Sequence, residues 1–247
     1  MRKLLRKGLA SLILLCATWN FYQLPLSAFS SATHEYATKK GIAICISVFK
    51  EASELYDERN VAQLHVFCTR PDEDEIEGAF KVHFYNPATE KNFNGEDDSA
   101  LSRYMVHYNN AVEFFKKGEK DKAISELGRA IHFMEDMNTP VHTNNQSFID
   151  STIDVFLHTS FEKRCVEIQS TVDASMQRRE FDYYKNNTLE QIGKASAMLA
   201  NDNFYALYKK TLERDIVAKN SVENAQKAVA GLLYRFFLDV RDCLLYT

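Results

Sequence analysis

Apolar positions recur at three- and four-residue steps along most of the chain, which is the spacing of one face of an α-helix. The segments with this spacing are 34–55, 99–117, 121–137, 148–176, one opening near residue 188, one opening near residue 202, and 221–245. Gly118 separates the second segment from the third, and the third must end before Pro140. The pattern predicts an all-α fold, built as a single-domain multi-helix bundle.

Residues 68–98 lose this period and read as a long loop. The stretch is polar, rich in turn-forming residues and dotted with aromatic side chains. A loop of this length inside a compact domain is usually functional. We therefore expect functional side chains in it.

Composition narrows the class of protein. The 247 residues are 45% hydrophobic and include only 8 Gly and 4 Pro, which suits a packed core and disfavours collagen, disordered linkers and turn-rich β-sandwiches. The formal net charge of -4, without a basic stripe, argues against a partner of duplex nucleic acid. The five Cys lie far apart with no Cys-x-x-Cys pair, so neither a disulfide framework nor a zinc finger is expected.

The first residues have the layout of a secretory signal. An apolar stretch over residues 9–17 follows four cations, Arg2, Lys3, Arg6 and Lys7. Cleavage is expected after Thr18, giving a signal peptide over 1–18 and a mature domain over 19–247, or alternatively near residue 30. A lipid anchor on Cys16 is disfavoured because Leu15 before it is bulky. We expect a secreted protein with no transmembrane segment in its mature form, since no apolar run reaches the roughly 18 residues that a span needs.

A helical-repeat protein is the local alternative. Gly118, Ala123 and Ala130 have the spacing of small residues in a tetratricopeptide repeat. That architecture must stack at least three units to bury its faces, and one is present. Two antiparallel helices packed on small residues explain the spacing as well.

Histidines and carboxylates form a pattern typical of a metal site. His132 and Asp136 are four residues apart on one predicted helix, and His158 and Glu162 repeat that spacing on the next. Residues four apart share a helix face. His142 lies between the two pairs, just after Pro140, where the chain has left the helix. Imidazole and carboxylate are ligands of Zn²⁺, and three protein ligands with an open position make a catalytic site.

Each pair alone also fits a simpler interpretation, because a His and an acidic residue four apart on a helix usually form a solvent-exposed pair that binds no metal. Two such pairs on consecutive helices, with a third His between them, are harder to reach by chance. His132 also lies in an apolar run, where an unpaired imidazole is costly to bury. His65 and His107 have no place in the pattern and are interpreted as structural or surface residues.

Four stretches together resemble the bacterial zinc-dependent phospholipases C, which share their all-α fold with single-strand-specific zinc nucleases. The matching pieces are THEYATKKGI at 33–42, HFYNPATEKNF at 83–93, LGRAIHFMEDMNTPVHTNN at 127–145 and HTSFE at 158–162. The apolar C-terminal segment also resembles the last helix of that family. The HFYNP loop favours the lipase branch over the nuclease branch.

The resemblance implies three zinc ions in a cleft at the helix ends. It assigns His142, His158 and Glu162 to one ion, and it assigns His83, His132, Asp136 and a carboxylate of the preceding loop to a second. The third ion would take His34, a bridging oxygen of Asp136, and the terminal amine and carbonyl of Trp19. Only cleavage after Thr18 would create that amine.

Within the loop, RPDEDE offers Asp72 and Asp74 as the carboxylate, and we prefer Asp72. In the family this residue binds zinc and is assigned as the general base. Phe80 matches an aromatic residue that packs on the substrate headgroup. Where the family has a Tyr beside the aspartate, this chain has Glu73 or Glu75, an acidic lip that would favour cationic or zwitterionic headgroups.

The implied activity is phospholipase C, the hydrolysis of a phospholipid to diacylglycerol and a phosphorylated headgroup. Zinc would neutralise charge on the phosphate and lower the pKa of a bound water. The expected partner is phospholipid at a membrane surface, and the expected state is a monomer. A zinc-dependent single-strand nuclease, another phosphodiesterase on the same fold, and a non-catalytic helical binding module are the alternatives.

Overall fold

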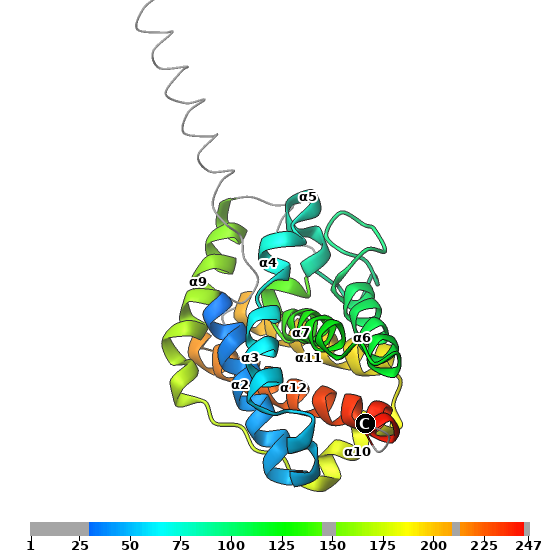
Figure 1. Cartoon of the computed structure of the whole chain (residues 1–247). Helices are drawn as coiled ribbons and strands as arrows, with labels where there is room; N and C mark the ends of the chain where they lie inside the picture. Colours follow the sequence, from blue (N-terminus) through cyan, green and yellow to red (C-terminus); the bar gives the residue numbers. More distant parts are fainter. Residues whose placement is uncertain (1–29, 145–151, 209–212, 245–247) are drawn as a thin grey trace, which may run out of the picture.

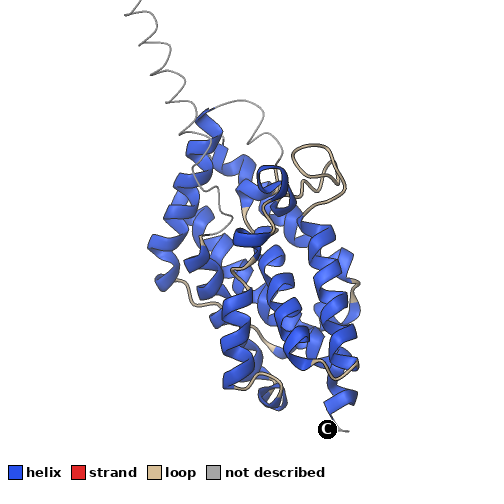
Figure 2. Cartoon of the chain, turned by 45° about the horizontal axis from the view of Figure 1, so that its top comes forward, coloured by secondary structure: helices blue, strands red, loops and turns tan. Residues whose placement is uncertain are grey.

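The chain folds into a bundle of helices packed along one another (Figure 1). The computed structural model describes residues 30–144, 152–208 and 213–244. Within these ranges the only β-type pairing is an isolated bridge between Asn86 and Lys91, and Figure 2 shows helices joined by loops. The predicted all-α fold is confirmed. No helix in the described ranges is long and apolar enough to cross a membrane.

The α-helices follow one another along the chain, with a longer connection over residues 81–99. They are α2 (Ser31–Val48), α3 (Glu58–Phe67), α4 (Pro71–Asp74), α5 (Glu77–Phe80), α6 (Ala100–Lys116), α7 (Lys120–Asp136), α9 (Thr152–Ile168), α10 (Arg178–Asn186), α11 (Leu189–Tyr208) and α12 (Arg214–Leu244). Short 3₁₀ turns lie between them: η1 (Lys50–Glu54), η2 (Lys81–His83), η3 (Pro140–His142) and η4 (Gln169–Thr171).

Several helix boundaries differ from the sequence prediction. Helix α9 ends at Ile168 rather than near 176, because Ser170, Thr171 and Asp173 favour helices poorly. The break expected near residue 202 is wrong: α11 continues to Tyr208, since its buried stripe continues through Phe204 and Leu207. Helices α3 and α10 were not predicted, and α12 begins earlier than residue 221.

The 68–98 segment is partly helical, contrary to the prediction of a structureless loop. Helices α4 and α5 and the turn η2 occupy residues 71–83 of it. Pro71 occupies the first turn of α4, where its missing N–H costs nothing. These pieces are too short for a helical period to be visible in the sequence.

Close helix packing fixes the bundle. Helix α6 turns back into α7 through Gly118, whose φ of 80° is accessible to glycine at little cost. Helix α2 packs along α12, where a Cβ on Gly41 would lie 2.5 Å from Cγ1 of Val229. Helix α7 is enclosed by α2, α3, α6 and α12. Every residue from Ala130 to Asn144 is buried, so the polar residues at the end of α7 lie inside the protein.

Candidate metal centre

The C-terminal turns of α7 carry two of the predicted ligands on one face. His132 and Asp136 are both fully buried, and Nε2 of His132 lies 3.3 Å from Oδ2 of Asp136. The four-residue spacing aligns them as the sequence predicts. The apolar residues beside them on α7 belong to the hydrophobic core, and they shield these two side chains from solvent.

The segment over residues 71–83 brings two further side chains to the same face. Nδ1 of His83 lies 2.9 Å from Oδ2 of Asp136 and 3.0 Å from Nε2 of His132. Oδ1 of Asp72 lies 3.9 Å from Nδ1 of His83 and 3.7 Å from Nε2 of His132. Asp72, His83 and His132 therefore form one group whose ligand atoms could hold a cation.

A second group lies beside the first, on η3 and α9. Nε2 of His158 lies 2.8 Å from Oε1 of Glu162, and Nε2 of His142 lies 3.3 Å from the same oxygen. The turn η3, which begins at Pro140, directs His142 inward, where it is buried. Its Nδ1 lies 3.8 Å from Oδ1 of Asp136, which links the two groups.

The third group includes His34, near the start of α2. Its ring stacks on that of His132 with centroids 4.0 Å apart, and its Nε2 lies 3.7 Å from Oδ1 of Asp136. His34, His132 and Asp136 are all fully buried. Trp19, the other predicted ligand of this group, lies outside the described residues, as does the expected cleavage position after Thr18, whereas the alternative position near residue 30 lies where the described range begins.

Backbone carbonyls fix the tautomers of three of these histidines. Nδ1 of His132 lies 2.8 Å from the carbonyl of Cys68, and Nδ1 of His142 lies 3.0 Å from the carbonyl of His83. A carbonyl oxygen can only accept, so each of these nitrogens donates an N–H. Nε2 of His83 likewise donates to the carbonyl of Glu75, at 3.0 Å. In the neutral rings, the nitrogens facing the cluster then carry lone pairs, which is how metal-binding histidines are held.

The cluster favours positive charge at its centre. Burial lowers the pKa of His132, but the carboxylates of Asp136 and Asp72 outweigh burial and raise that pKa to about 9. Burial would raise the pKa of Asp136, but the neighbouring His132, His83 and His142 hold it well below its usual range.

Buried carboxylate oxygens without a hydrogen-bond donor indicate whether the cluster suits a metal ion. Both carboxylate oxygens of Asp72 and Oδ1 of Asp136 are buried, and they accept no hydrogen bond within the described residues. Leaving such atoms unpaired is costly. Imidazole nitrogens and carboxylate oxygens in groups of three are the donor set that Zn²⁺ takes. The residues present therefore fit a divalent metal ion.

The two candidate carboxylates of the loop, Asp72 and Asp74, point in different directions. Asp72 faces the cluster, whereas Asp74 accepts hydrogen bonds from Arg129 at 2.7 and 2.5 Å. Phe80 lies at the edge of the histidine cluster and is partly exposed, and its ring centroid is 6.0 Å from that of His83. Its φ of 64° is in the left-handed region, a strained conformation for an aromatic residue.

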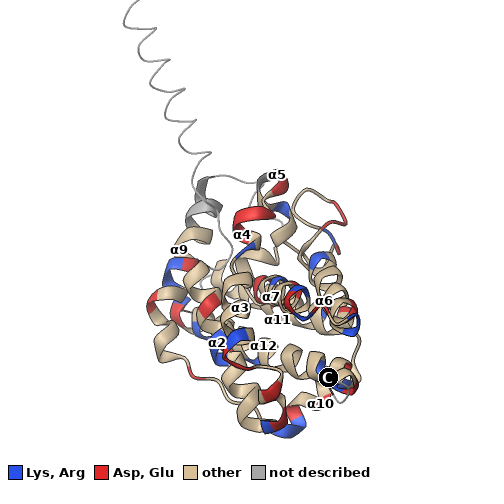
Figure 3. Ribbon diagram, in the orientation of Figure 1, with Lys and Arg blue, Asp and Glu red and all other residues tan. Residues whose placement is uncertain are grey.

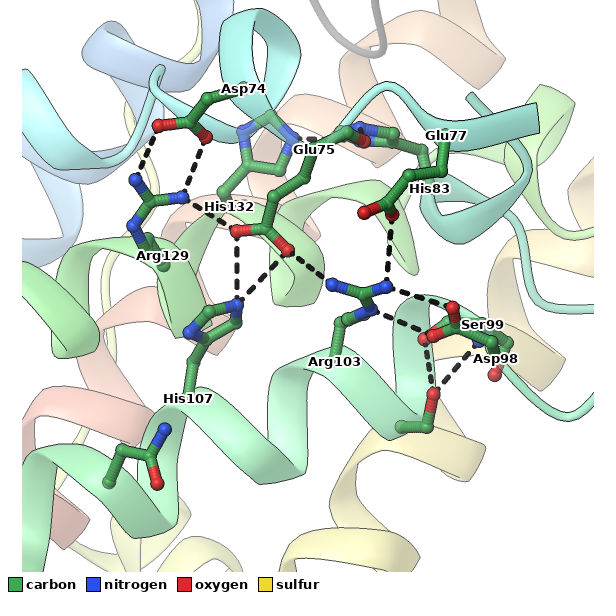
Figure 4. A network of polar contacts seen from close by, with 12 residues as sticks. Asp74, Glu75, Glu77, His83, Asp98, Ser99, Arg103, His107, Arg129 and His132 are labelled. Carbon is green, nitrogen blue, oxygen red and sulfur yellow. Dashed lines mark hydrogen bonds and ion pairs between the residues drawn. The ribbon is translucent and has the colours of Figure 1, made fainter. Parts of the chain in front are cut away.

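Glu75 is a residue that sequence analysis considered only as a neighbour of the aspartate. Its buried carboxylate accepts hydrogen bonds from Arg129 at 2.6 Å and from Arg103 at 3.0 Å, and it contacts His107 at 3.1 Å (Figure 4). Burial would raise the pKa of Glu75, but His107 and Arg129 outweigh it and lower that pKa to about 2. Because the backbone carbonyl of Glu75 also orients His83, this network fastens the 71–83 segment to α6 and α7.

The acidic residues of the expected lip are paired with arginines. Helix α4 is mostly acidic (Figure 3), but Glu73 pairs with Arg70 at 2.6 Å, and Glu77 pairs with Arg103 at 3.0 Å. Asp74 and Glu75 are also paired with arginines. His107, expected to be structural, packs its ring on Phe133 and joins the Glu75 network. His65 is half-buried and is not part of the candidate ligand groups.

Known proteins with related sequences are phospholipases C. A phospholipase C of Clostridium novyi is 29% identical over 211 residues, and one of Clostridium perfringens is 27% identical over 206 residues. These alignments cover 76% and 75% of this chain. The predicted resemblance is confirmed. The chain spans about half the length of these relatives, 52% and 51% respectively. No protein-family model matches the chain.

Solved structures agree at the level of the fold. The alpha toxin of Clostridium absonum superposes with a TM-score of 0.74 and is 26% identical, covering 84% of this chain and 63% of the toxin. The Clostridium perfringens alpha-toxin from avian strain SWCP has the same TM-score at 22% identity, covering 87% of this chain and 65% of that toxin. The second likeness supports the all-α fold alone.

Proposed function

We propose that the chain is the catalytic domain of an exported, zinc-dependent phospholipase C that acts on phospholipid at a membrane surface. The observation that carries the proposal is the convergence of three groups of candidate ligands at the end of α7. Relatives named phospholipase C supply the reaction class. Cleavage of residues 1–18, three zinc ions and a monomeric state are parts of the same proposal.

Each candidate ligand has a defined task. His142, His158 and Glu162 would hold one ion, and Asp72, His83, His132 and Asp136 would hold a second. Trp19, His34 and Asp136 would hold the third. Bound zinc would neutralise the phosphodiester charge and lower the pKa of a bound water.

Asp72 is assigned as the general base. Its two oxygens accept no hydrogen bond within the described residues, so one can face a cation while the other accepts the proton of the attacking water. Phe80 is assigned to the headgroup, because it lies partly exposed beside His83. Attack of the water oxygen on phosphorus would then break the bond to the glycerol oxygen, which takes up the proton removed from the water, and release diacylglycerol and the phosphorylated headgroup. No covalent bond to the protein is needed.

The test is an assay of the secreted protein on phosphatidylcholine vesicles, vesicles of other phospholipids and single-stranded DNA, with and without chelator. We expect phosphocholine release that stops with chelator and returns with Zn²⁺. His142→Ala should reduce turnover to the chelated level, while His65→Ala, a histidine outside the cluster, should keep it. Cleavage of DNA alone would indicate a nuclease, and absence of turnover on all substrates would indicate a binding module.

A further inference from the structure

Glu135 is a fully buried carboxylate next to the candidate ligand Asp136, and neither the motif nor the spacing pointed to it. Its Oε2 lies 2.6 Å from Nδ1 of His34, and its Oε1 accepts a hydrogen bond from the hydroxyl of Thr38 at 3.0 Å. Both partners belong to α2, one helical turn apart. Among the ion pairs of the described chain, Glu135 has no Lys or Arg partner.

An unpaired buried carboxylate is expensive, so its surroundings must offset its charge. The nearest basic group that the described contacts offer is the imidazole of His34, which itself lies among other histidines. By contrast, Glu75, which is slightly less buried, pairs with two arginines. The negative charge of Glu135 therefore lacks a compensating positive charge among the described contacts, and a cation bound nearby would supply one.

The contact with Glu135 determines which nitrogen of His34 carries the proton and which one presents a lone pair to the cluster. When Glu135 is ionised it only accepts, so Nδ1 of His34 donates its N–H, and Nε2 keeps its lone pair. Nε2 then faces Oδ1 of Asp136 at 3.7 Å, and that oxygen accepts no hydrogen bond within the described residues. Two acceptors opposed at this distance repel each other, whereas two ligands of one divalent cation lie at about this separation, given Zn–N and Zn–O distances near 2.1 Å.

We propose that Glu135 is a positioning residue of the His34–Asp136 metal site. It holds His34 in the tautomer whose Nε2 faces Asp136, and it adds a second negative charge that retains a divalent cation there. A carboxylate behind a metal-binding histidine raises the basicity of the ligand and fixes its ring. The inference rests on the metal centre of the proposed function and adds a residue to it.

The competing explanation is that Thr38, Glu135 and His34 form a neutral structural network. The two explanations differ in the consequence of removing only the charge. Glu135→Gln keeps the size of the side chain and its capacity to accept from Nδ1. The matched control is Glu126→Gln, which removes a half-buried carboxylate of the same helix that contacts His107 and Asn110.

The experiment counts zinc per chain by elemental analysis after dialysis against chelators of increasing strength. For Glu135→Gln we expect one ion to be lost at least about 10-fold more readily than in the wild type, with the other ions unchanged. Glu126→Gln should retain every ion. Retention of all ions by Glu135→Gln with wild-type affinity would overturn the proposal.

Two further measurements keep the proposal testable if Glu135→Gln folds poorly. Nitrogen-15 spectra of the zinc-loaded wild type should show His34 protonated at Nδ1, and protonation at Nε2 would refute the assignment. Thr38→Val keeps the charge but removes the hydrogen bond that holds it. It should weaken the same ion by a smaller factor, and an unchanged affinity would count against the proposal.

None of these readouts needs catalysis, so the two proposals fail separately. A wild type that binds zinc with His34 protonated at Nδ1 but hydrolyses no phospholipid overturns the proposed function alone. A zinc-dependent phospholipase whose Glu135→Gln variant keeps all its ions overturns the role of Glu135 alone.

Discussion

At the scale of single residues, the outer nitrogen of four of the five clustered histidines decides what the inner nitrogen can do. Carbonyls of Cys68, His83 and Glu75 accept from His132, His142 and His83, and Glu135 accepts from His34. These partners leave lone pairs directed at Asp136, Asp72 and Glu162. The outer contacts therefore fix which nitrogen of each of these rings faces the cluster, and that nitrogen is available to bind a cation.

His107, outside the cluster, gives a test based on pH. Burial lowers the pKa of His107, but hydrogen bonds to Glu126 and Glu75 outweigh it and raise the pKa above the usual 6.5. A raised pKa means that this contribution to stability is complete below about pH 6.5 and is lost as pH rises through the folded-state pKa. His107→Gln should therefore cost most stability at acidic pH, and the difference from the wild type should shrink toward alkaline pH.

The measurement is urea unfolding of the metal-free wild type and His107→Gln between pH 6 and 9. Other titrating groups are shared by the two proteins and cancel in the difference. A difference in unfolding free energy that stays constant over this range would contradict the assigned ion pairs.

Sequence reasoning could find the residues that share a local spacing but not their distant partners. His132 and Asp136, or His158 and Glu162, are visible because a helix repeats every 3.6 residues. Glu135 contacts His34 across 101 positions of sequence, and Arg129 contacts Glu75 across 54. No periodicity links such pairs, because only the packing of α2 and α4 on α7 brings them together.

At the scale of elements, Arg129 joins α7 to α4. Replacing it with Met keeps the apolar stem but leaves the buried Glu75 carboxylate short of a partner. We expect a loss of about 1–3 kcal/mol in stability, together with faster hydrogen exchange over residues 71–83. Arg59→Met is the control, because its pair with Asp121 is solvent-exposed on both sides and should cost less than about 1 kcal/mol. Equal costs for the two variants would argue against the anchoring role of Arg129.

Gly41 tests the packing of α2, the helix that carries His34. An Ala Cβ there would meet Cγ1 of Val229 at 2.5 Å and the backbone nitrogen of Ala230 at 3.1 Å. Ala favours helices over Gly by about 1 kcal/mol, but overpacking costs about 1–3 kcal/mol. We expect a net loss of stability by chemical denaturation. A Gly41→Ala variant more stable than the wild type would show that α2 and α12 can separate freely.

The elements themselves were predictable where they are long. The spacing located α6 and α7 to within a residue or two, because each buries one continuous face. It missed α10, whose only buried residue is Phe181, and it could not see helices of four residues such as α4. Short helices are held by tertiary contacts, of which the Glu75 network is one, rather than by a sequence period.

At the scale of the whole molecule, the candidate ligands come from four separated parts of the chain: α2, the 71–83 segment, the end of α7 with η3, and α9. A cation bound among them would cross-link these parts in the folded state only, so binding adds directly to folding stability. The buried carboxylates repel one another when no cation is present, which lowers the stability of the metal-free protein further.

Removing the metal should therefore lower the melting temperature. One ion at 100 times its dissociation constant contributes about 2.7 kcal/mol, and for a chain of this size each kcal/mol shifts the melting temperature by about 2–4 °C. We expect chelation to lower it by at least about 5 °C and Zn²⁺ to restore it, as measured by calorimetry. His142→Ala, which lacks one ligand, should respond less to the chelator, whereas His65→Ala should respond fully. If elemental analysis shows that zinc has left the wild type and its melting temperature is unchanged, the cluster does not hold these segments together through a cation.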